Sequence, residues 1–323
     1  MRGLSLLLTL PDAHSAADNL RNTHSLRNAV VRLVSFLALI ILLGALYALW
    51  IRPRQLHWGA TPAEISRAMP ADGIIPDPAF DATRAITIRA RPAEIWPWLV
   101  QMGFGRAGFY GYDLIENPGN GAGIRSTREI LPRFQHPRPG DPLPLSVAAT
   151  LIYGPIEPNH YMVWLGSNHP PSGAFVWELV PIDANQTRLI SRIRWNYLST
   201  PAMFALGVFT EFADHVAVRA ILRGVRDRAE GRPPQSLFAQ GCEIAAWFLA
   251  LLEFVVAGLW VFTWRNWKQA WLLAAGAGLL LQLLLYAGLP IWFGAPLPCL
   301  YFLLLARSRR QAQSLPSCNH MVA

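Results

Sequence analysis

Three long blocks of apolar residues interrupt an otherwise mixed sequence, and they set the first expectation about the chain. The first block covers residues 30–52, and its central part, Leu33–Ile51, carries no charged side chain. A helix of about 20 apolar residues is long enough to cross the hydrocarbon core of a bilayer. We therefore expect residues 30–52 to form a transmembrane helix. Residues 1–29, which are polar and irregular after a short apolar run, are expected to be disordered.

The other two apolar blocks lie toward the C-terminal end of the chain. Residues 242–264 have the length of one span. Residues 269–306 are too long for one span, and Gly288-Leu-Pro290 offers a natural break. We expect two helices there, the second of which is crowded by prolines. The chain would then cross a membrane four times and end in a disordered tail over residues 307–323.

Between these blocks, over residues 55–235, the pattern changes to the alternation that is typical of half-buried β-strands. Ala174–Val180 and Thr187–Trp195 both alternate, and the polar residues 183–186 fit a hairpin turn between them. From Pro201 to Glu230 the apolar spacing becomes helical. The pattern predicts an α+β domain in which a long amphipathic helix follows an antiparallel sheet. One face of that sheet is expected to be packed and the other to face water.

Composition and charge support a membrane protein and argue against a nucleic-acid-binding one. Hydrophobic residues make up 53% of the chain and charged residues 15%, and the net charge is +8. The arginines flank apolar blocks or close a helix, which favours contact with anionic lipid head groups over contact with nucleic acid. Arginines lie on both sides of the first span, so the side of the membrane that holds the domain stays undecided, and no protein partner is indicated.

The remaining chemistry of the sequence gives no sign of a metal or cofactor. The eight histidines and three cysteines show no paired ligand spacing. Gly119–Gly123 resembles a phosphate-binding loop only by composition, because it follows an expected helix rather than a strand. We therefore expect no metal and no cofactor.

Four segments together resemble a known family. A strand, a helix that begins at a proline, a Gly/aromatic segment and an acidic helix follow one another over Ala82–Asn117. The turn Pro139-Gly-Asp141, the pair Phe175–Pro181 and Thr187–Leu189, and the helical Arg223–Glu230 come after it in order. This arrangement resembles the START-like superfamily (SRPBCC, or polyketide-cyclase/dehydratase-like), in its membrane-anchored bacterial branch, over roughly residues 58–231.

The resemblance implies a helix-grip fold, in which a curved antiparallel sheet clasps a long C-terminal helix around a hydrophobic cavity. It implies that most relatives bind or carry lipids, sterols or polyketides, and that a minority are cyclases or hydrolases. This chain departs from the expected pattern at Gly111, where a serine is expected, and at Val218, where a glutamate is expected. Both departures remove polar atoms from pocket positions and weaken a catalytic reading.

Aromatic and aliphatic residues on the first helix, the inner strand faces and the long helix are the candidate cavity wall. The alternative for each is ordinary core packing. The candidates are Trp98, Met102, Phe109, Tyr110, Tyr112, Phe175, Trp177, Ile193, Trp195, Phe209, Phe212 and Val216.

Three titratable residues are weaker catalytic candidates. Asp113 and Glu116 are three apart on one expected helix, and a buried carboxyl pair has split pKa values that suit acid–base chemistry. The favoured alternative is a surface helix paired with an arginine. His215 lies four residues after Glu211, a spacing that fits a general base but more often marks a helix ion pair.

Glu253 is the one charged residue within Ile244–Trp264, the interior of the second apolar block. A charged residue within a span is a functional candidate by default. Gln282 would lie at nearly equal depth in the following helix, so the favoured alternative is a hydrogen bond that joins the two helices.

These observations favour a membrane-anchored helix-grip domain that binds a hydrophobic small molecule or lipid, as a carrier or sensor. The first alternative is a cyclase or hydrolase that acts on a hydrophobic substrate in the same cavity. The second is a non-catalytic interaction module whose cavity is filled by its own side chains.

Overall fold

The computed structural model describes residues 13–119, 123–196, 201–287 and 291–313. The chain divides into two compact units. One unit comprises Ala48–Ala245, and the other comprises Met1–Tyr47 together with Ala246–Ala323. Each unit is described by itself below.

The first unit is built on a six-stranded antiparallel sheet with the order β1-β6-β5-β4-β3-β2. Its strands are β1 (Phe80–Ile88), β2 (Pro142–Pro144), β3 (Thr150–Glu157), β4 (Tyr161–Gly166), β5 (Gly173–Pro181) and β6 (Thr187–Trp195). The predicted hairpin turn between β5 and β6 is present, and its Ile182 and Asp183 backbone N–H groups donate to the carbonyl of Gln186.

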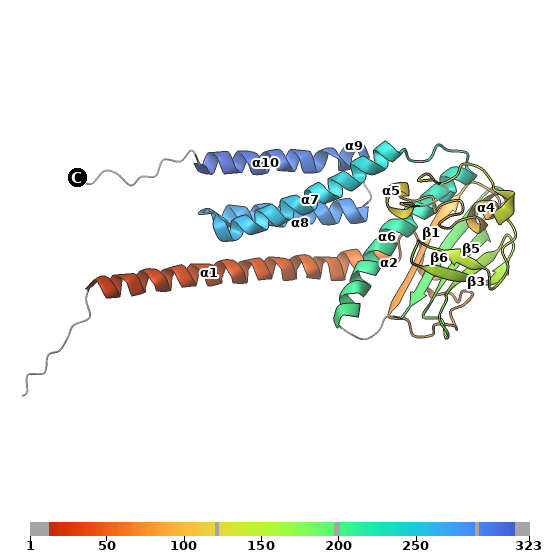
Figure 1. Ribbon diagram of the computed structural model, residues 1–323, viewed down its shortest axis with the longest axis horizontal. Helices are drawn as coiled ribbons and strands as arrows, with labels where there is room; N and C mark the ends of the chain where they lie inside the picture. The colour runs from red at the N-terminus through yellow and green to blue at the C-terminus, as the bar shows by residue number, and fades with distance from the viewer. Residues whose placement is uncertain (1–12, 120–122, 197–200, 288–290, 314–323) are drawn as a thin grey trace, which may run out of the picture. The chain divides into compact units, whose positions relative to one another are not determined.

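Short helices surround the sheet, and one long helix crosses it. They are the π-helix η1 (Tyr47–Ile51), which starts at the unit boundary, α2 (Arg52–Leu56), α3 (Pro62–Ser66), α4 (Pro92–Val100), α5 (Asp113–Glu116), the 3-10 helix η2 (Pro132–Phe134) and α6 (Pro201–Ala229). Helix α6 packs on β1 and α4 (Figure 1). The sheet and α6 together form the predicted α+β helix-grip fold.

The main core lies between the inner face of the sheet and helices α4 and α6. Alternation places Phe175, Trp177 and Leu179 of β5 on this face, opposite Val218, Leu222 and Val225 of α6. Met102, Leu222 and Val225 are completely buried. Burying an aliphatic side chain of this size stabilises the folded state by about 1.5–3 kcal/mol, so this layer fixes α6 on the sheet.

The outer face of the sheet is also covered, contrary to the expectation that it faces water. Met69 and Ile75, from the segment between α3 and β1, pack on Val163, Val176 and Ile190 of β4, β5 and β6. Helix α3 begins with a capping box, in which Thr61 and Glu64 each accept a hydrogen bond from the other's backbone N–H. The segment therefore starts from a fixed point and then crosses the outer face.

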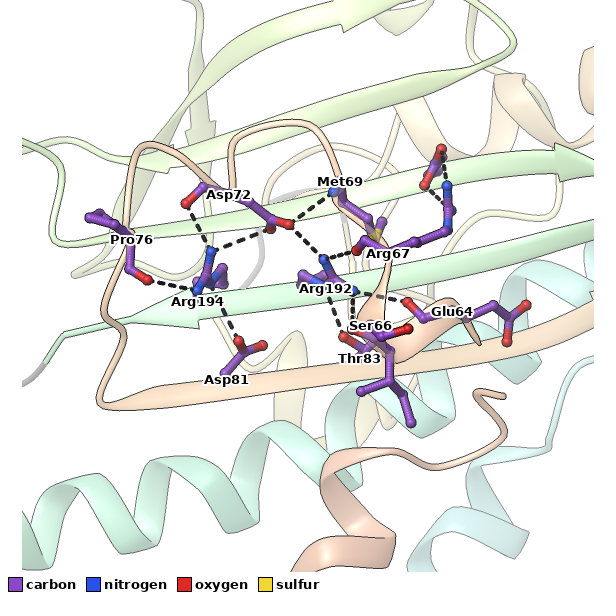
Figure 2. A network of polar contacts seen from close by, with 12 residues as sticks. Glu64, Ser66, Arg67, Met69, Asp72, Pro76, Asp81, Thr83, Arg192 and Arg194 are labelled. Carbon is purple, nitrogen blue, oxygen red and sulfur yellow. Dashed lines mark hydrogen bonds and ion pairs between the residues drawn. The ribbon is translucent and has the colours of Figure 1, made fainter. Parts of the chain in front are cut away.

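Arginines of β6 hold this covering segment in place. Figure 2 shows Arg192 and Arg194 reaching from β6 toward the segment between Glu64 and Pro76. Arg192 is 4% exposed, and all five N–H donors of its guanidinium are used. The acceptors are Thr83 Oγ1, Asp72 Oδ2 and the carbonyls of Glu64, Ile65 and Arg67.

The second unit is helical. Its helices are α1 (Ala13–Leu46), the part of α7 (Leu237–Thr263) from Ala246 onward, α8 (Trp267–Ala287), α9 (Ile291–Gly294) and α10 (Pro296–Gln313). Within the described residues, three helical stretches are long and apolar enough to cross a membrane, by length and composition: Thr23–Leu56, Leu237–Thr263 and Trp267–Tyr286.

Three expectations about this unit are corrected. Helix α1 begins at Ala13, so residues 13–29 are helical rather than disordered, and α10 extends the helix beyond residue 307 to Gln313. The expected fourth span at 289–306 is not among the three qualifying stretches of the described chain. The proline-rich sequence divides this region into α9 and α10, and α10 carries Arg307, Arg309 and Arg310 in its second half.

Polar contacts join α1 to the neighbouring helices of this unit. The indole N–H of Trp271 donates to the carbonyl of Ser35 at 2.9 Å, and Gln282 Nε2 donates to the carbonyl of Leu43 at 3.1 Å. Gln282 therefore binds α1, and the expected hydrogen bond between Gln282 and Glu253 is absent from the described structure.

Candidate functional site

A row of aromatic rings crosses the inner face of the sheet over β4, β5 and β6. The centroids of Trp164 and Trp177 are 5.3 Å apart, and Phe175 lies 6.3 Å from both Trp164 and Trp195. The order of the rings follows the strand register, in which Trp164 is opposite Phe175 and Trp195 is opposite Gly173. A Cβ atom at Gly173 would lie 1.9 Å from the ring of Trp195, so a glycine is needed there for the ring to lie flat on the strand.

Two of these rings carry polar groups that the protein leaves unused. Trp164 is 3% exposed and Trp177 is 1% exposed. The Nε1 atoms of both are buried, and no acceptor of the described chain lies within hydrogen-bond distance. Buried tryptophan N–H groups ordinarily find a partner, and leaving one unsatisfied costs about 1–3 kcal/mol. The inner face therefore presents two adjacent hydrogen-bond donors in apolar surroundings.

Most of the predicted wall residues lie in or against the same core. Met102, Phe109, Tyr110 and Trp177 belong to it, and Trp98, Phe175 and Trp195 pack on it while partly exposed. Ile193 is buried in a small adjoining cluster with Phe175 and Trp195. Whether these residues line a ligand cavity stays a prediction.

The remaining predicted wall residues lie apart from this row. On α6, Val216 is buried, whereas Phe209 is 62% exposed, and its ring centroid lies 6.4 Å from that of Phe212, with the two rings tilted by 53°. Tyr112 is buried, and its hydroxyl donates to Glu243 Oε1 at 2.8 Å. Phe209 therefore does not share the closed core of Trp177.

Tyr110 is held rigidly at the other end of the core. Its φ is +69°, an unusual value for a residue with a side chain. Its hydroxyl accepts from Gln101 Nε2 at 2.9 Å and donates to the carbonyl of Trp98 at 3.1 Å, and the guanidinium of Arg228 lies 4.1 Å from its ring centre. Burial raises the pKa of this hydroxyl well above its ordinary value. Tyr110 is thus suited to shape a wall rather than to transfer a proton.

Asp113 and Glu116 serve separate local contacts. Asp113 Oδ1 accepts hydrogen bonds from the backbone N–H and hydroxyl of Ser126, at 3.1 and 2.6 Å, and from Asn117 Nδ2 at 3.0 Å. Glu116 Oε2 accepts from the backbone N–H of Gly111 at 3.2 Å. Neither arrangement matches the surface ion pair with an arginine that was the favoured alternative.

The environment of Glu116 explains the missing serine at position 111. A Cβ atom at Gly111 would lie 2.3 Å from Glu116 Oε1, so the carboxyl takes the place of a side chain there. Burial, with a smaller contribution from Asp113, raises the pKa of Glu116 to about 7. The carboxyl of Glu116 therefore packs against the backbone of Gly111, at a place where burial favours its protonated form.

His215 belongs to a buried polar cluster that sequence reasoning missed. The ring is 1% exposed, and its Nδ1 lies 3.2 Å from the carbonyl of Gln55. The same carbonyl accepts from Arg84 Nε at 2.8 Å, and the Arg84 guanidinium forms an ion pair with Asp214. Burial raises the pKa of Asp214, and Arg84 acts in the opposite direction. The sequence feature that could have revealed this cluster is Arg84 itself. It lies two and four residues before Ile86 and Ile88, so all three side chains share the inner face of β1.

Glu211, the spacing partner of His215, forms a two-point ion pair with Arg52 at 2.7 and 2.8 Å. This contact and the Arg84–Asp214 pair tie α6 to α2 and β1. The cluster around His215 therefore has a clear structural role.

Comparison with known proteins gives structural likenesses alone. No protein-family model and no curated protein matches the chain. Similar solved structures include a protein from Thermobifida fusca, at 15% identity and a TM-score of 0.30, with 48% of this chain and 99% of that chain covered. The Polyketide_cyc-like protein Cgl2372 from Corynebacterium glutamicum is 11% identical, with a TM-score of 0.29 and coverage of 45% and 88%.

CalU16 from Micromonospora echinospora is a further similar structure, at 17% identity and a TM-score of 0.26, with coverage of 51% of this chain and 90% of that chain. The helix-grip assignment itself follows from the strand order and from the packing of α6 on the sheet. These features define an α+β helix-grip protein with an aromatic inner face.

Proposed function

We propose that the Ala48–Ala245 unit binds a hydrophobic small molecule or lipid that carries a hydrogen-bond acceptor, and that the apolar helices hold the protein in a membrane. The observation that carries the proposal is the pair of unused indole donors of Trp164 and Trp177. A carbonyl, ether or hydroxyl oxygen of a ligand would satisfy both donors. The surrounding rings would supply apolar contact, worth about 25 cal/mol per Å2 buried.

Binding is favoured over a cyclase or hydrolase activity by the positions of the acidic candidates. Asp113 is engaged with Ser126, and Glu116 packs against Gly111. Neither carboxyl is part of the aromatic row on β4, β5 and β6. Membrane attachment would raise the local concentration of a ligand that comes from the bilayer.

The test is to purify the full-length protein in mild detergent and to identify retained small molecules by native mass spectrometry and lipid extraction. The proposal expects one hydrophobic molecule with an oxygen acceptor at a stoichiometry near one. The variant with Trp164→Phe and Trp177→Phe should retain at least tenfold less. Trp96→Phe, a matched change in the same core, should retain the wild-type amount. Protein that carries no ligand and takes up no apolar probe would overturn the proposal.

A further inference from the structure

The helical unit contains an apolar groove between α7 and α10, with a volume of about 390 Å³. The two helices run in roughly the same direction (Figure 1). The groove is lined by Leu249, Leu252, Glu253, Val256, Trp260, Phe302, Leu305, Ala306, Arg309 and Arg310. Its walls are thus mostly aliphatic and aromatic, with three charged exceptions.

The first exception is Glu253, the charged residue that stood out in the sequence. It is 1% exposed, and both of its carboxylate oxygens are buried without a hydrogen-bond partner in the described part of the chain. Burial of a carboxyl group without a hydrogen-bond partner lowers the stability of the folded protein. Since Gln282 binds the carbonyl of Leu43, the neighbouring helix does not supply that partner. A ligand in the groove is in a position to do so.

The other two exceptions give the groove a cationic end. Arg309 lies with its guanidinium 5.7 Å from the ring centre of Trp260, and Arg310 lines the groove beside it. Trp260 follows Glu253 by about two helical turns, or ~10 Å along α7. The groove therefore has an apolar body, a buried carboxyl along it and two arginines at the end where α7 and α10 approach their C-termini.

We propose that this groove binds one anionic lipid molecule, independently of the helix-grip site. The headgroup phosphate or carboxylate pairs with Arg309 and Arg310, which suit oxyanions because the guanidinium presents several donors in one plane. The acyl chain lies along the apolar wall that includes Leu249, Leu252 and Val256. A polar group of the lipid meets the carboxyl of Glu253. The occupant is therefore an anionic phospholipid, which has polar groups besides its phosphate, whereas a free fatty acid has only its carboxylate.

The test is a titration of the full-length, delipidated protein with phosphatidylglycerol and with phosphatidylcholine of the same chains, followed by native mass spectrometry. Tight binding of one phosphatidylglycerol is expected, at least tenfold stronger than that of phosphatidylcholine. The variant with Arg309→Gln and Arg310→Gln should lose at least tenfold in affinity. The control with Arg265→Gln and Arg307→Gln loses the same charge from exposed positions outside the groove and should change less than twofold.

A second pair of variants tests the groove without altering its charge. Val256→Trp fills the groove, whereas Val255→Trp places the same ring at the adjacent, exposed position, which does not line it. Loss of lipid from Val256→Trp alone supports the proposal. Equal losses from both arginine double variants, or equal affinity for phosphatidylcholine, would overturn it. Trp164→Phe and Trp177→Phe should leave this binding unchanged, which separates it from the proposed helix-grip site.

Discussion

Arg192 on the outer face of the sheet and the pair Trp164 and Trp177 on its inner face differ in whether their buried N–H donors have acceptors. On the outer face, Arg192 is nearly inaccessible and every N–H donor of its guanidinium has an acceptor. On the inner face, Trp164 and Trp177 are equally buried, and their N–H donors have no acceptor among the described residues. A buried polar group whose hydrogen-bond donors all have acceptors within the protein indicates a structural role. Buried donors without acceptors on the inner face agree with the proposal that a ligand supplies the acceptor there.

The largest expected effect on stability comes from removing Arg192, whose N–H donors all have acceptors. Arg192→Ala removes the guanidinium that donates to Thr83 Oγ1 and to three backbone carbonyls, and it leaves Asp72 Oδ2 with the backbone N–H of Met69 alone. The loss of one partner from a buried charged network costs about 3–5 kcal/mol. We expect a large drop in the thermal unfolding midpoint of the full-length protein in detergent. Arg91→Ala removes an arginine whose ion pair with Glu94 is exposed, and should leave the midpoint unchanged. Equal drops for the two variants would contradict the structural role of Arg192.

A pH effect is expected next, from Glu116. Because its pKa is raised from 4.5 to about 7, the folded protein keeps a proton that the unfolded chain releases between these values. Stability should therefore fall as pH rises from about 4.5 to about 7 and stay level above that, by at most ~3 kcal/mol. Glu116→Gln should flatten this decline in unfolding midpoint against pH. Glu94→Gln, at an exposed carboxylate, should keep the wild-type slope, and a slope that Glu116→Gln leaves intact would refute the assignment.

A smaller effect tests how closely α6 approaches the inner side of the domain. A Cβ atom at Gly224 would lie 2.0 Å from the carbonyl oxygen of Tyr110, whereas at Gly241, also within a helix, the nearest atom is 3.7 Å away. Gly224→Ala should destabilise by about 1–3 kcal/mol through overpacking. Gly241→Ala should stabilise by up to ~1 kcal/mol through helix propensity. Chemical denaturation of both variants measures the contrast, and a stabilised Gly224→Ala would show that α6 lies farther away.

The smallest effect on stability is expected from replacing Trp177, whose indole N–H has no acceptor in the described structure. Trp177→Phe removes a buried donor that has no partner, so the cost of the lost ring volume is partly offset, and unfolding of the ligand-free protein should change by about 1 kcal/mol or less. Ligand retention, in contrast, should fall at least tenfold. A strong loss of stability with unchanged retention would assign Trp177 to the core alone.

Alternation and helical spacing were enough to predict the architecture. The strands at Ala174–Val180 and Thr187–Trp195, the turn between them and the long helix from Pro201 are all present. Local patterns of this kind depend on backbone periodicity and short-range hydrogen bonds, which the sequence displays directly.

The covering of the outer face could not be predicted in this way. Alternation places Arg192 opposite the core, but it does not distinguish an arginine in water from one buried beneath a loop. The acceptors of Arg192 in the covering segment lie within residues 64–72, where no periodicity marks a segment that will cross a sheet. The role of Gly111 was likewise hidden, because it depends on the carboxyl of Glu116 packing against it. The aromatic row was anticipated at Phe175, Trp177 and Trp195, whereas the unused donor of Trp164 required the three-dimensional structure.

The most direct test of the central claim is the indole N–H spectrum of the full-length, 15N-tryptophan-labelled protein in detergent, recorded before and after addition of the co-purified molecule. Trp164→Phe and Trp177→Phe assign the two resonances. The account predicts that these two resonances move downfield on ligand addition, as N–H groups do when they gain an acceptor, while that of Trp271, which already donates to Ser35, stays in place. Resonances of Trp164 and Trp177 that do not move would contradict it.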